Sequence, residues 1–380
     1  MSQELSKAIE EHFKSLSDPR RKTANQRHNF VDILVIAICG IICGANGWVA
    51  VEKFGKAKED WFSGFLELPN GIPSHDTFTD VFAKLSPKQF EACFISWVES
   101  ISELFDGEVV SIDGKTLRRS HDVSFDKKAI HMVSAWASAN SLVLGQIKTD
   151  EKSNEITAIP ELLKSLELKG CLVTIDAMGC QKKIAEVIIE SDADYLLVVK
   201  DNQPNLHQAI QDYFAQANEA DFEDYKIDFA ETFNKGHGRL ESRRCWVGYD
   251  ALPYIDDSQN WEELQTIVMV ESERTIKEET TIEHRYYISS TKDTAASLLN
   301  ASRMHWGIEN SLHWRLDIAF REDDSRIRKG HGAENFAILR HIALNLLEKE
   351  DTAKVGIKNK RLMAGWDNSY LEKVLAGLAS

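Results

Sequence analysis

The apolar pattern of this chain changes once, near residue 105, and that change constrains the fold more than any other feature of the sequence. Before it, apolar residues recur at helical spacing in stretches such as FVDILVIAICG and KQFEACFISWVESISELF. After it come short, continuous apolar runs, which are typical of buried strands. We therefore expect an all-helical N-terminal domain over residues 1–105, followed by an α/β domain.

The second part of the chain alternates strands with helices. Three strand-like runs come first, and the order helix, strand, helix, strand follows, which predicts a mixed sheet flanked by helices. Residues 222–285 are acidic and strand-like, so we expect a β-rich insertion there. The fold class is thus α/β, with a core in two pieces, residues 106–221 and 286–380. The predicted core strands are 108–113, 129–138, 142–149, 171–176, 195–200 and 286–290.

The apolar stretch ILVIAICGIICGANGWVAV, residues 33–51, is long enough to suggest a membrane span. Glycines and an asparagine interrupt it, and it fits a pair of buried helices better. The N-terminus lacks the basic and apolar regions of a signal peptide, and the 6 cysteines form no CxxC pair. We therefore expect a cytoplasmic protein with reduced cysteines, no zinc site and no membrane partner.

The net charge of −15 at first argues against a nucleic-acid partner, because phosphate binding needs a basic surface. The acidity is concentrated, however, in residues 201–300, which hold 9 Lys and Arg against 20 Asp and Glu. Residues 301–380 hold 13 against 11. A basic DNA-binding face elsewhere is compatible with these numbers, so charge alone does not identify the partner.

Two of the predicted strands end in the same way. VVSID ends in Asp113 and LVTID ends in Asp176, and small residues follow each acid. If both strands belong to one sheet, their carboxylates can converge, and they then repel each other unless one is protonated or a cation lies between them. Mg²⁺ suits such a place because it takes oxygen ligands. The alternative is that each Asp only ends a strand and caps a turn.

A third acid for a two-metal site is Glu309, within HWGIENSLHWRLDIAFRED. On a helix, His305, Glu309 and His313 form a stripe, which also suggests a His-Glu-His metal site. The two histidines would lie about 12 Å apart along the helix axis, too far to share one ion. We therefore expect both histidines to form hydrogen bonds or to face DNA, and Trp306 and Trp314 to serve mostly in packing.

Blocks of sequence spread over nearly the whole chain carry a resemblance to a known family. They are DPRR, LVIAICGIICGANGW, GIPSHDTFTDVF, IDGKTLRRS, TIDAMGCQ, VVKDNQPNL, GHGRLESRR and HWGIENSLHWRLDIAFRED. In this order they resemble the DDE transposases of bacterial insertion sequences, specifically the H-repeat-associated transposases. The resemblance implies an RNase H-like catalytic core, with one Asp on the first strand and one on the fourth. It places the Glu on a later helix, beyond a β-rich insertion.

Carried over by position, the family triad is Asp113, Asp176 and Glu309, which would hold two Mg²⁺ ions, with Mn²⁺ as a substitute. The ion held by Asp113 and Glu309 would activate water and later a 3′-hydroxyl. The ion held by Asp113 and Asp176 would stabilise the leaving oxygen. The resemblance implies hydrolysis at the element ends and strand transfer into a target. The implied partners are double-stranded DNA and further copies of the chain, and the N-terminal domain is a candidate for reading DNA ends or for dimerisation.

Related transposases carry a Tyr, an Arg and a Lys around the Glu, where this chain has Ser302, His305 and Leu316. Arg303 and Arg315 lie close by and are candidates to replace them. Other residues after strand ends or in the insertion are candidates to contact DNA, although each is equally compatible with a solvated side chain. The full set of candidate DNA-binding residues is Lys115, Arg118, Arg119, Lys200, Asn202, Gln203, His237, Arg239, Arg243, Arg244, Arg303, His305, His313 and Arg315.

Two other interpretations stay open. The chain could be a catalytically decayed, DNA-binding relic of a transposase. It could also be a metal-dependent nuclease with an RNase H-like fold that acts on RNA:DNA hybrids or repair intermediates. Strand transfer into target DNA would separate the transposase from both, and DNA binding without cleavage would identify the relic.

Overall fold

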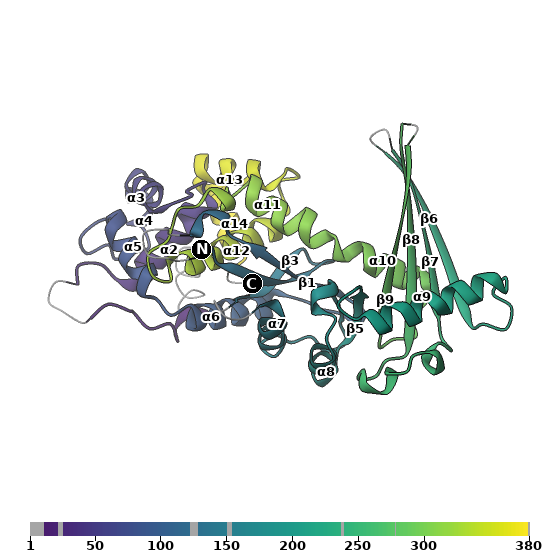
Figure 1. Ribbon diagram of the computed structural model, residues 1–380. Coiled ribbons are helices and arrows are strands. Elements are labelled where there is room, and N and C mark those ends of the chain that lie inside the picture. Colours follow the sequence, from purple (N-terminus) through teal and green to yellow (C-terminus); the bar gives the residue numbers. More distant parts are fainter. Residues whose placement is uncertain are drawn as a thin grey trace.

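The computed structural model describes residues 11–21, 26–121, 128–149, 154–236, 239–277 and 279–378. Helices from the two ends of the chain gather on one side of the molecule, the sheet crosses the middle, and four long strands stand at the far side (Figure 1). The prediction of an α/β protein with a large mixed sheet flanked by helices is confirmed.

The first hundred residues are helical within the described ranges. Helix α2 is buried continuously from Asp32 to Ile42, because its residues are almost all apolar and leave no polar face. The stretch that resembled a membrane span thus covers the buried helix α2 and the start of α3, of which only Trp48, Val51 and Gly55 are buried, so the prediction of a buried pair is correct for α2 alone. Among the described helices, none has both the length and the apolar character needed to cross a membrane. The helices of this part are α2 (Phe30–Ile42), α3 (Trp48–Ala57), α4 (Glu59–Phe62), α5 (His75–Lys84) and α6 (Pro87–Ile101).

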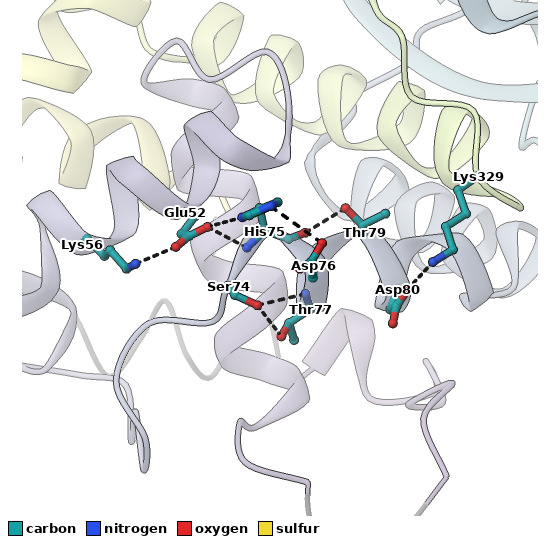
Figure 2. Close-up of polar contacts among 9 residues, drawn as sticks. All are labelled: Glu52, Lys56, Ser74, His75, Asp76, Thr77, Thr79, Asp80 and Lys329. Carbon is teal, nitrogen blue, oxygen red and sulfur yellow. Dashed lines mark hydrogen bonds and ion pairs between the residues drawn. The ribbon is translucent and has the colours of Figure 1, made fainter.

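Polar contacts at the start of α5 tie three parts of the chain together (Figure 2). Ser74 caps the helix by accepting a hydrogen bond from a backbone N–H of the first turn. Glu52 of α3 accepts a hydrogen bond from the backbone N–H of His75, at 2.8 Å, and lies 2.6 Å from its ring. Lys329 reaches Asp80 of the same helix from the C-terminal part of the chain. These contacts link α3 to α5 and the N-terminal helices to the rest of the protein.

The described residues form one nine-stranded sheet in the order β3-β2-β1-β4-β5-β9-β8-β7-β6. Strands β1, β4 and β5 run parallel to one another, and the other neighbouring pairs are antiparallel. The strands are β1 (Val109–Thr116), β2 (His131–Ala137), β3 (Leu142–Lys148), β4 (Leu172–Ile175), β5 (Asp194–Val199), β6 (Ile227–Gly236), β7 (Arg239–Gly248), β8 (Thr266–Ile276) and β9 (Glu279–Ser289).

Side chains alternate along β1 and enter two different hydrophobic clusters. Val110 and Ile112 lie in the main core, which includes residues of α7 (Glu155–Leu163) and α8 (Lys182–Glu190). Val109 lies in a second cluster with residues of α10 (Ala295–His305). The sheet is thus covered on both faces, which explains why its central strands read as continuous apolar runs.

The C-terminal helices complete the core. Helix α12 (Gly332–Lys349) is buried along nearly its whole length, because it contacts α2, α5, α6 and β3. It therefore joins the N-terminal helices and the sheet in one hydrophobic core. The division into the four predicted segments stays a prediction. The remaining helices are α9 (Pro204–Glu219), α11 (Trp314–Ile318), α13 (Ile357–Trp366) and α14 (Asn368–Ala376), with short turns η1 (Arg118–Ser120), η3 (Ala177–Gly179), η4 (Leu252–Tyr254), η5 (Ser258–Asn260) and η7 (Glu322–Asp324).

The segment predicted to be a β-rich insertion forms β6 to β9, an antiparallel meander that extends the core sheet. The link is the pairing of β9 with β5, in which Tyr286 lies opposite Val199 and Ser289 opposite Leu196. The short strand expected at 286–290 is therefore the end of an 11-residue strand. The outer ends of these strands project beyond the helices (Figure 1).

Candidate active site

Asp113 and Asp176 lie at adjacent positions because β1 pairs with β4. In this parallel register Ile112 of β1 lies opposite Ile175 of β4, and in each segment the next residue is the acid. Strand β1 does not end at Asp113, as the sequence suggested, but continues to Thr116. The pairing of β1 with β2 on its other side holds this continuation in the sheet.

Each of the two carboxylates has a fixed orientation. Asp113 accepts a hydrogen bond from the backbone N–H of Gly114 through Oδ1, at 2.8 Å, and its Oδ2 lies 3.5 Å from Nδ1 of His313. Asp176 caps the turn η3, because its Oδ1 accepts hydrogen bonds from the backbone N–H groups of Met178 and Gly179. The alternative considered for both acids was that each only caps a turn. It applies to Asp176 alone, and there to a single oxygen, Oδ1.

Negative charges accumulate around Asp113. Burial raises the pKa of Asp113 to about 7, and the nearby charges of Asp176, Glu155 and Glu309 act in the same direction. Burial also raises the pKa of Asp176, and the charge of Glu155 adds to this effect. These carboxylates are therefore close enough to destabilise one another's ionised forms.

Glu309 lies on a π-helical segment, η6 (Ile308–His313), between α10 and α11. The sequence predicted an uninterrupted helix here, but the chain widens to a π-turn where this segment contacts β1. Such π-turns occur frequently at functional sites. Glu309 is exposed and yet near enough to raise the pKa of Asp113, so it faces the edge of the site from the solvent side.

The two histidines of the predicted stripe contact the sheet. His305 Nδ1 lies 3.1 Å from Oγ1 of Thr174 on β4, and His313 lies beside Asp113. Burial lowers the pKa of each histidine to about 4, so both are neutral at pH 7. The expected packing role of Trp306 and Trp314 is wrong: their side chains are 38% and 59% exposed. The inner side of these helices is occupied by Ile308, Leu312 and Leu316 instead.

Lys115, which the sequence placed in a basic turn, lies inside β1. Its side chain is only 13% exposed and its Nζ binds the carboxylates of Asp317, at 2.5 Å, and Glu322, at 3.0 Å. Glu322 also lies 3.4 Å from the buried guanidinium of Arg340. The charge of Lys115 is therefore already compensated inside the protein, and the lysine ties β1 to α11.

Two of the candidates that follow β5 brace the turn of Asp176. Asn202 donates a hydrogen bond to the backbone carbonyl of Ala177, at 2.6 Å, and Gln203 donates one to that of Cys180, at 2.9 Å. Lys200 is exposed, and its charge lowers the pKa of Asp176 in opposition to burial. Lys200 is therefore a cation near the acids that remains accessible to solvent.

Most of the arginine candidates carry ion pairs, and His237 lies outside the described residues. In an ion-paired arginine, a carboxylate already compensates the charge and uses some of the five N–H donors, so a phosphate competes with that partner. The exception is Arg303, which has no ion pair among the described residues and is exposed. The pairs are Arg118–Asp323, Arg119–Asp324, Arg239–Glu241, Arg243–Glu241, Arg315–Glu348, and Arg244 with Glu231, Glu271 and Glu273.

A groove of about 520 Å³ lies between the outer parts of β7 to β9 and the end of α10. Arg303, Arg285, Trp306 and Asn310 are among the residues that line it. The guanidinium carbon of Arg285 stands 4.2 Å from the centroid of the Trp306 ring, a cation–π contact. Two of the lining residues, Trp306 and Asn310, lie within three positions of Glu309 in the sequence. Arg285 and Trp306 are groove residues that the sequence analysis did not select as candidates for DNA binding.

Glu155 is a further residue near the acids that the sequence analysis did not select. It is the first residue of α7, after the capping residue Asn154, and its Oε1 lies 2.6 Å from Nε2 of His131. An acid in the first turn of a helix is common, because it complements the helix dipole, so the pattern alone did not distinguish it. Only the folded structure distinguishes Glu155 from other such acids, because it places this residue near Asp113 and Asp176.

The residues around Asp113 offer a divalent metal oxygen ligands and uncompensated negative charge. Carboxylate oxygens are the ligands that Mg²⁺ prefers, and the raised pKa of Asp113 reflects negative charge that a cation would compensate. No group of three or more His, Cys, Asp and Glu side chains in the described part of the chain is arranged to hold an ion. Mg²⁺ does not require such a cage, because it commonly binds one or two carboxylates together with waters and substrate phosphates. The residues therefore fit a metal that is completed by its substrate.

Comparison with known proteins adds independent information. The family described as "Transposase DDE domain" matches residues 104–346, and the one described as "DDE_Tnp_1-associated" matches residues 10–98. The H repeat-associated putative transposase YhhI of Escherichia coli (strain K12) is 44% identical, with 98% of each chain covered. The putative transposase YncI of Escherichia coli O157:H7 is 44% identical over 94% of this chain and 91% of its own.

Two further similarities are weaker. The protein named inactive transposase YbfQ, of Escherichia coli (strain K12), is 36% identical over 20% of this chain and 92% of its own. A piggyBac transposase, solved as a synaptic complex with hairpin DNA, covers 99% of this chain and 78% of its own at a TM-score of 0.44 and 12% identity. A structural likeness at that level carries no argument about this chain.

Proposed function

We propose, from the premise that the chain belongs to the transposase DDE domain family, that Asp113, Asp176 and Glu309 form one catalytic site for phosphoryl transfer at DNA ends. The observation that carries the proposal is the in-register pairing of β1 with β4, which sets two acids side by side, together with the contact of the Glu309 segment with β1. The reaction proposed is hydrolysis at the ends of an insertion sequence, followed by strand transfer into target DNA.

The strand order supports an RNase H-like core. In the order β3-β2-β1-β4-β5, the strands β1, β4 and β5 run parallel to one another. Strand β2 runs antiparallel to both of its neighbours, β1 and β3. In this proposal β6 to β9 are an insertion between β5 and α10. The N-terminal helices are a separate element that reads DNA ends or joins copies of the chain.

The carboxylates would hold two Mg²⁺ ions, or Mn²⁺ in their place, with Asp113 shared between Asp176 on one side and Glu309 on the other. When bound, such ions activate the attacking oxygen and neutralise charge on the phosphate. The backbone N–H groups of the turn η3 fix the orientation of Asp176. His313 lies against Asp113, and because its ring is neutral it leaves the negative charge of Asp113 available to a metal ion. The chain thus contributes mainly positioning and a preformed place for positive charge.

The groove beside Glu309 is the proposed DNA interface closest to the chemistry. Arg303, which has no ion pair in the described part of the chain, offers a cation to a phosphate, and the partly exposed Trp306 ring, with Arg285 over one face, offers a surface against which a base can pack. Lys200 supplies a second exposed cation near Asp176. We further propose that copies of the chain assemble on DNA so that both element ends are held at once.

The experiment that tests this function is cleavage of a DNA fragment that carries the element's own flanking inverted repeats, in the presence of Mg²⁺. Wild type is compared with Glu309→Gln, which keeps the size of the side chain and removes its charge. We expect cutting at the repeat ends, and joining to a target plasmid, by wild type alone.

Each other result argues against a part of the proposal. Repeat binding without cutting by wild type would identify a decayed relic. Cutting without any joining, or cutting of RNA:DNA hybrids instead, would favour a nuclease. Equal cutting by Glu309→Gln would remove Glu309 from the site.

A further inference from the structure

We propose that the face of β7 to β9 that carries Glu241 binds the sugar–phosphate backbone of double-stranded DNA, irrespective of the DNA sequence. This inference rests on the proposed function, which makes DNA the substrate, and it extends the DNA interface from the groove at Arg303 to the outer strands. It also assigns Glu241 a role, that of an internal carboxylate with which DNA phosphates compete. The arginines proposed to contact DNA are Arg239, Arg243, Arg274 and Arg303.

Two consecutive arginines of β7 lie on opposite faces of the sheet, because side chains alternate along a strand. The guanidinium of Arg244 contacts three carboxylates at 2.5–3.1 Å, and two of these belong to residues directly opposite it on β6 and β8. Arg243 pairs instead with Glu241, two positions away on its own face, and lines the groove. These neighbours in sequence therefore belong to two different surfaces.

The two faces have opposite ratios of arginine to carboxylate. On the face of Arg244, three carboxylates surround one guanidinium. On the face of Glu241, three arginines share one carboxylate, which lies 2.7 Å from Nη2 of Arg243 and 3.5 Å from Nε of both Arg239 and Arg274. One negative charge does not compensate three positive ones, so this cluster keeps a positive charge that attracts an anion.

The positive charge continues toward α10. Arg303 of this helix has no ion pair in the described ranges, and it lines the same groove of about 520 Å³ as Arg243 and Arg274. Arg285, which also lines the groove, adds no net charge because it donates two hydrogen bonds to Glu283, at 2.8 and 3.1 Å. The arginine cluster on the strands and Arg303 on the helix therefore face one space.

The arginines of the cluster are accessible to a large polyanion. Arg239 and Arg274 are 42% and 45% exposed, and the outer ends of their strands project beyond the helices (Figure 1). From Arg239 to Arg243 the strand extends about 13 Å, and phosphates follow one another at about 3.4 Å along each strand of DNA. Each guanidinium has five N–H donors and binds a phosphate well. Backbone contacts carry no sequence information, so this surface should bind any duplex.

The competing explanation is that these ion pairs only hold the strands together, and DNA binding separates the two. Binding of the full-length protein to a short duplex of unrelated sequence is measured at several salt concentrations. The variant is Arg243→Met, and the matched control is Arg244→Met, its neighbour on the other face. We expect Arg243→Met to weaken binding and to reduce the slope of log affinity against log salt by about 1. Arg244→Met should keep the wild-type affinity and slope.

Removal of the shared carboxylate gives a second, opposite effect. Glu241→Gln keeps the size of the side chain and removes the charge that competes with phosphate, so it should raise the affinity for the duplex about 2- to 5-fold, the size expected for an exposed ion pair. Glu231→Gln, which removes a partner of Arg244, should leave the affinity unchanged. A purely structural Glu241 predicts equal or weaker binding instead. Circular dichroism and the melting temperature of each variant report any loss of folding.

The outcomes distinguish this inference from the proposed function. If folded Arg243→Met and Arg274→Met bind the duplex like wild type and Arg303→Met binds it more weakly, the inference fails alone. If Arg243→Met and Arg244→Met weaken binding equally, only the total charge matters and the inference fails as well. If wild type binds neither this duplex nor the repeats, the proposed function fails together with the inference. Binding through this face without any cutting at the repeats would contradict the proposed reaction and support the inference.

Discussion

Two regions of the sheet treat charge in opposite ways. At the edge formed by β1 and β4, Asp113 and Asp176 lie with Glu155 and Glu309 near them, and the pKa of Asp113 rises to about 7. On the strands β6 to β9, the guanidinium of Arg244 contacts three carboxylates at 2.5–3.1 Å. One region accumulates like charges, and the other pairs opposite ones.

The difference shows which charged residues are available for function. A group whose charge is satisfied inside the protein contributes to structure, and its exchange for a ligand costs the contacts it already has. A cluster of like charges is unfavourable for folding, which makes it a candidate site for binding an opposite charge. The acids selected from sequence belong to the second kind, whereas most of the basic candidates belong to the first.

The largest expected effect is that of Asp113→Asn. We expect loss of DNA cleavage by about 10³-fold or more, because the variant removes the charge that we propose to bind the metal. At pH 8 the same variant should be more stable than wild type by about 1–3 kcal/mol, because a desolvated charge among acids is removed. Cleavage and chemical denaturation measure the two effects. A variant that cleaves normally, or that loses both activity and stability, would contradict the contrast drawn between the two regions.

A matched pair of arginine variants tests the contrast from the other side. Arg244→Met should lower the free energy of unfolding by about 1 kcal/mol, because three carboxylates lose their shared cation. Arg303→Met should leave stability unchanged, weaken DNA binding and reduce the slope of log affinity against log salt by about 1. Urea denaturation and binding at several salt concentrations provide the data. The contrast between the two regions is wrong if Arg303→Met lowers stability and Arg244→Met weakens DNA binding instead.

A buried carboxyl outside the proposed triad tests whether a raised pKa alone marks function. Burial raises the pKa of Glu91 to about 8, above its usual 4.5, although its Oε1 accepts a hydrogen bond from the backbone N–H of Gln146. The folded chain therefore keeps a proton that the unfolded chain releases, and stability falls as pH rises from about 4.5 to 8.

Glu91→Gln should remove this pH dependence. We expect a higher melting temperature than wild type at pH 8, a much smaller difference at pH 4.5, and unchanged DNA cleavage. If folded Glu91→Gln loses cleavage, a raised pKa caused by burial alone does mark a functional residue, and the contrast between Glu91 and the acids at β1 and β4 fails.

The smallest effect is expected from Arg118→Met. Arg118 is 80% exposed and pairs with Asp323 at 3.2 Å, so the loss in stability should be below about 0.5 kcal/mol. Any role in binding phosphate should appear as a small, salt-dependent loss of DNA affinity. A loss of stability above about 1 kcal/mol would show that the exposed pair contributes more than such pairs usually do.

Sequence reasoning worked best where a local pattern has one structural outcome. The apolar runs that lead to Asp113 and Asp176 formed neighbouring strands, and most of the stretch 33–51 became the buried helix α2. It failed where two segments distant in sequence meet. The burial of Lys115 depends on α11 and η7, which follow about 200 residues later, and no pattern around Lys115 indicates them.

The sequence by itself determined the order of the main elements, the acid that follows each of two apolar runs and the family to which the chain belongs, because these depend on local periodicity and on residue identity at spaced positions. The tertiary structure alone decided which charges are compensated. It brought Glu155 against Gly114, widened the helix at Glu309 into a π-turn, and turned most of the candidate arginines toward carboxylates. The physical reason is that compensation depends on distances between side chains, and chain folding sets those distances among residues far apart in sequence.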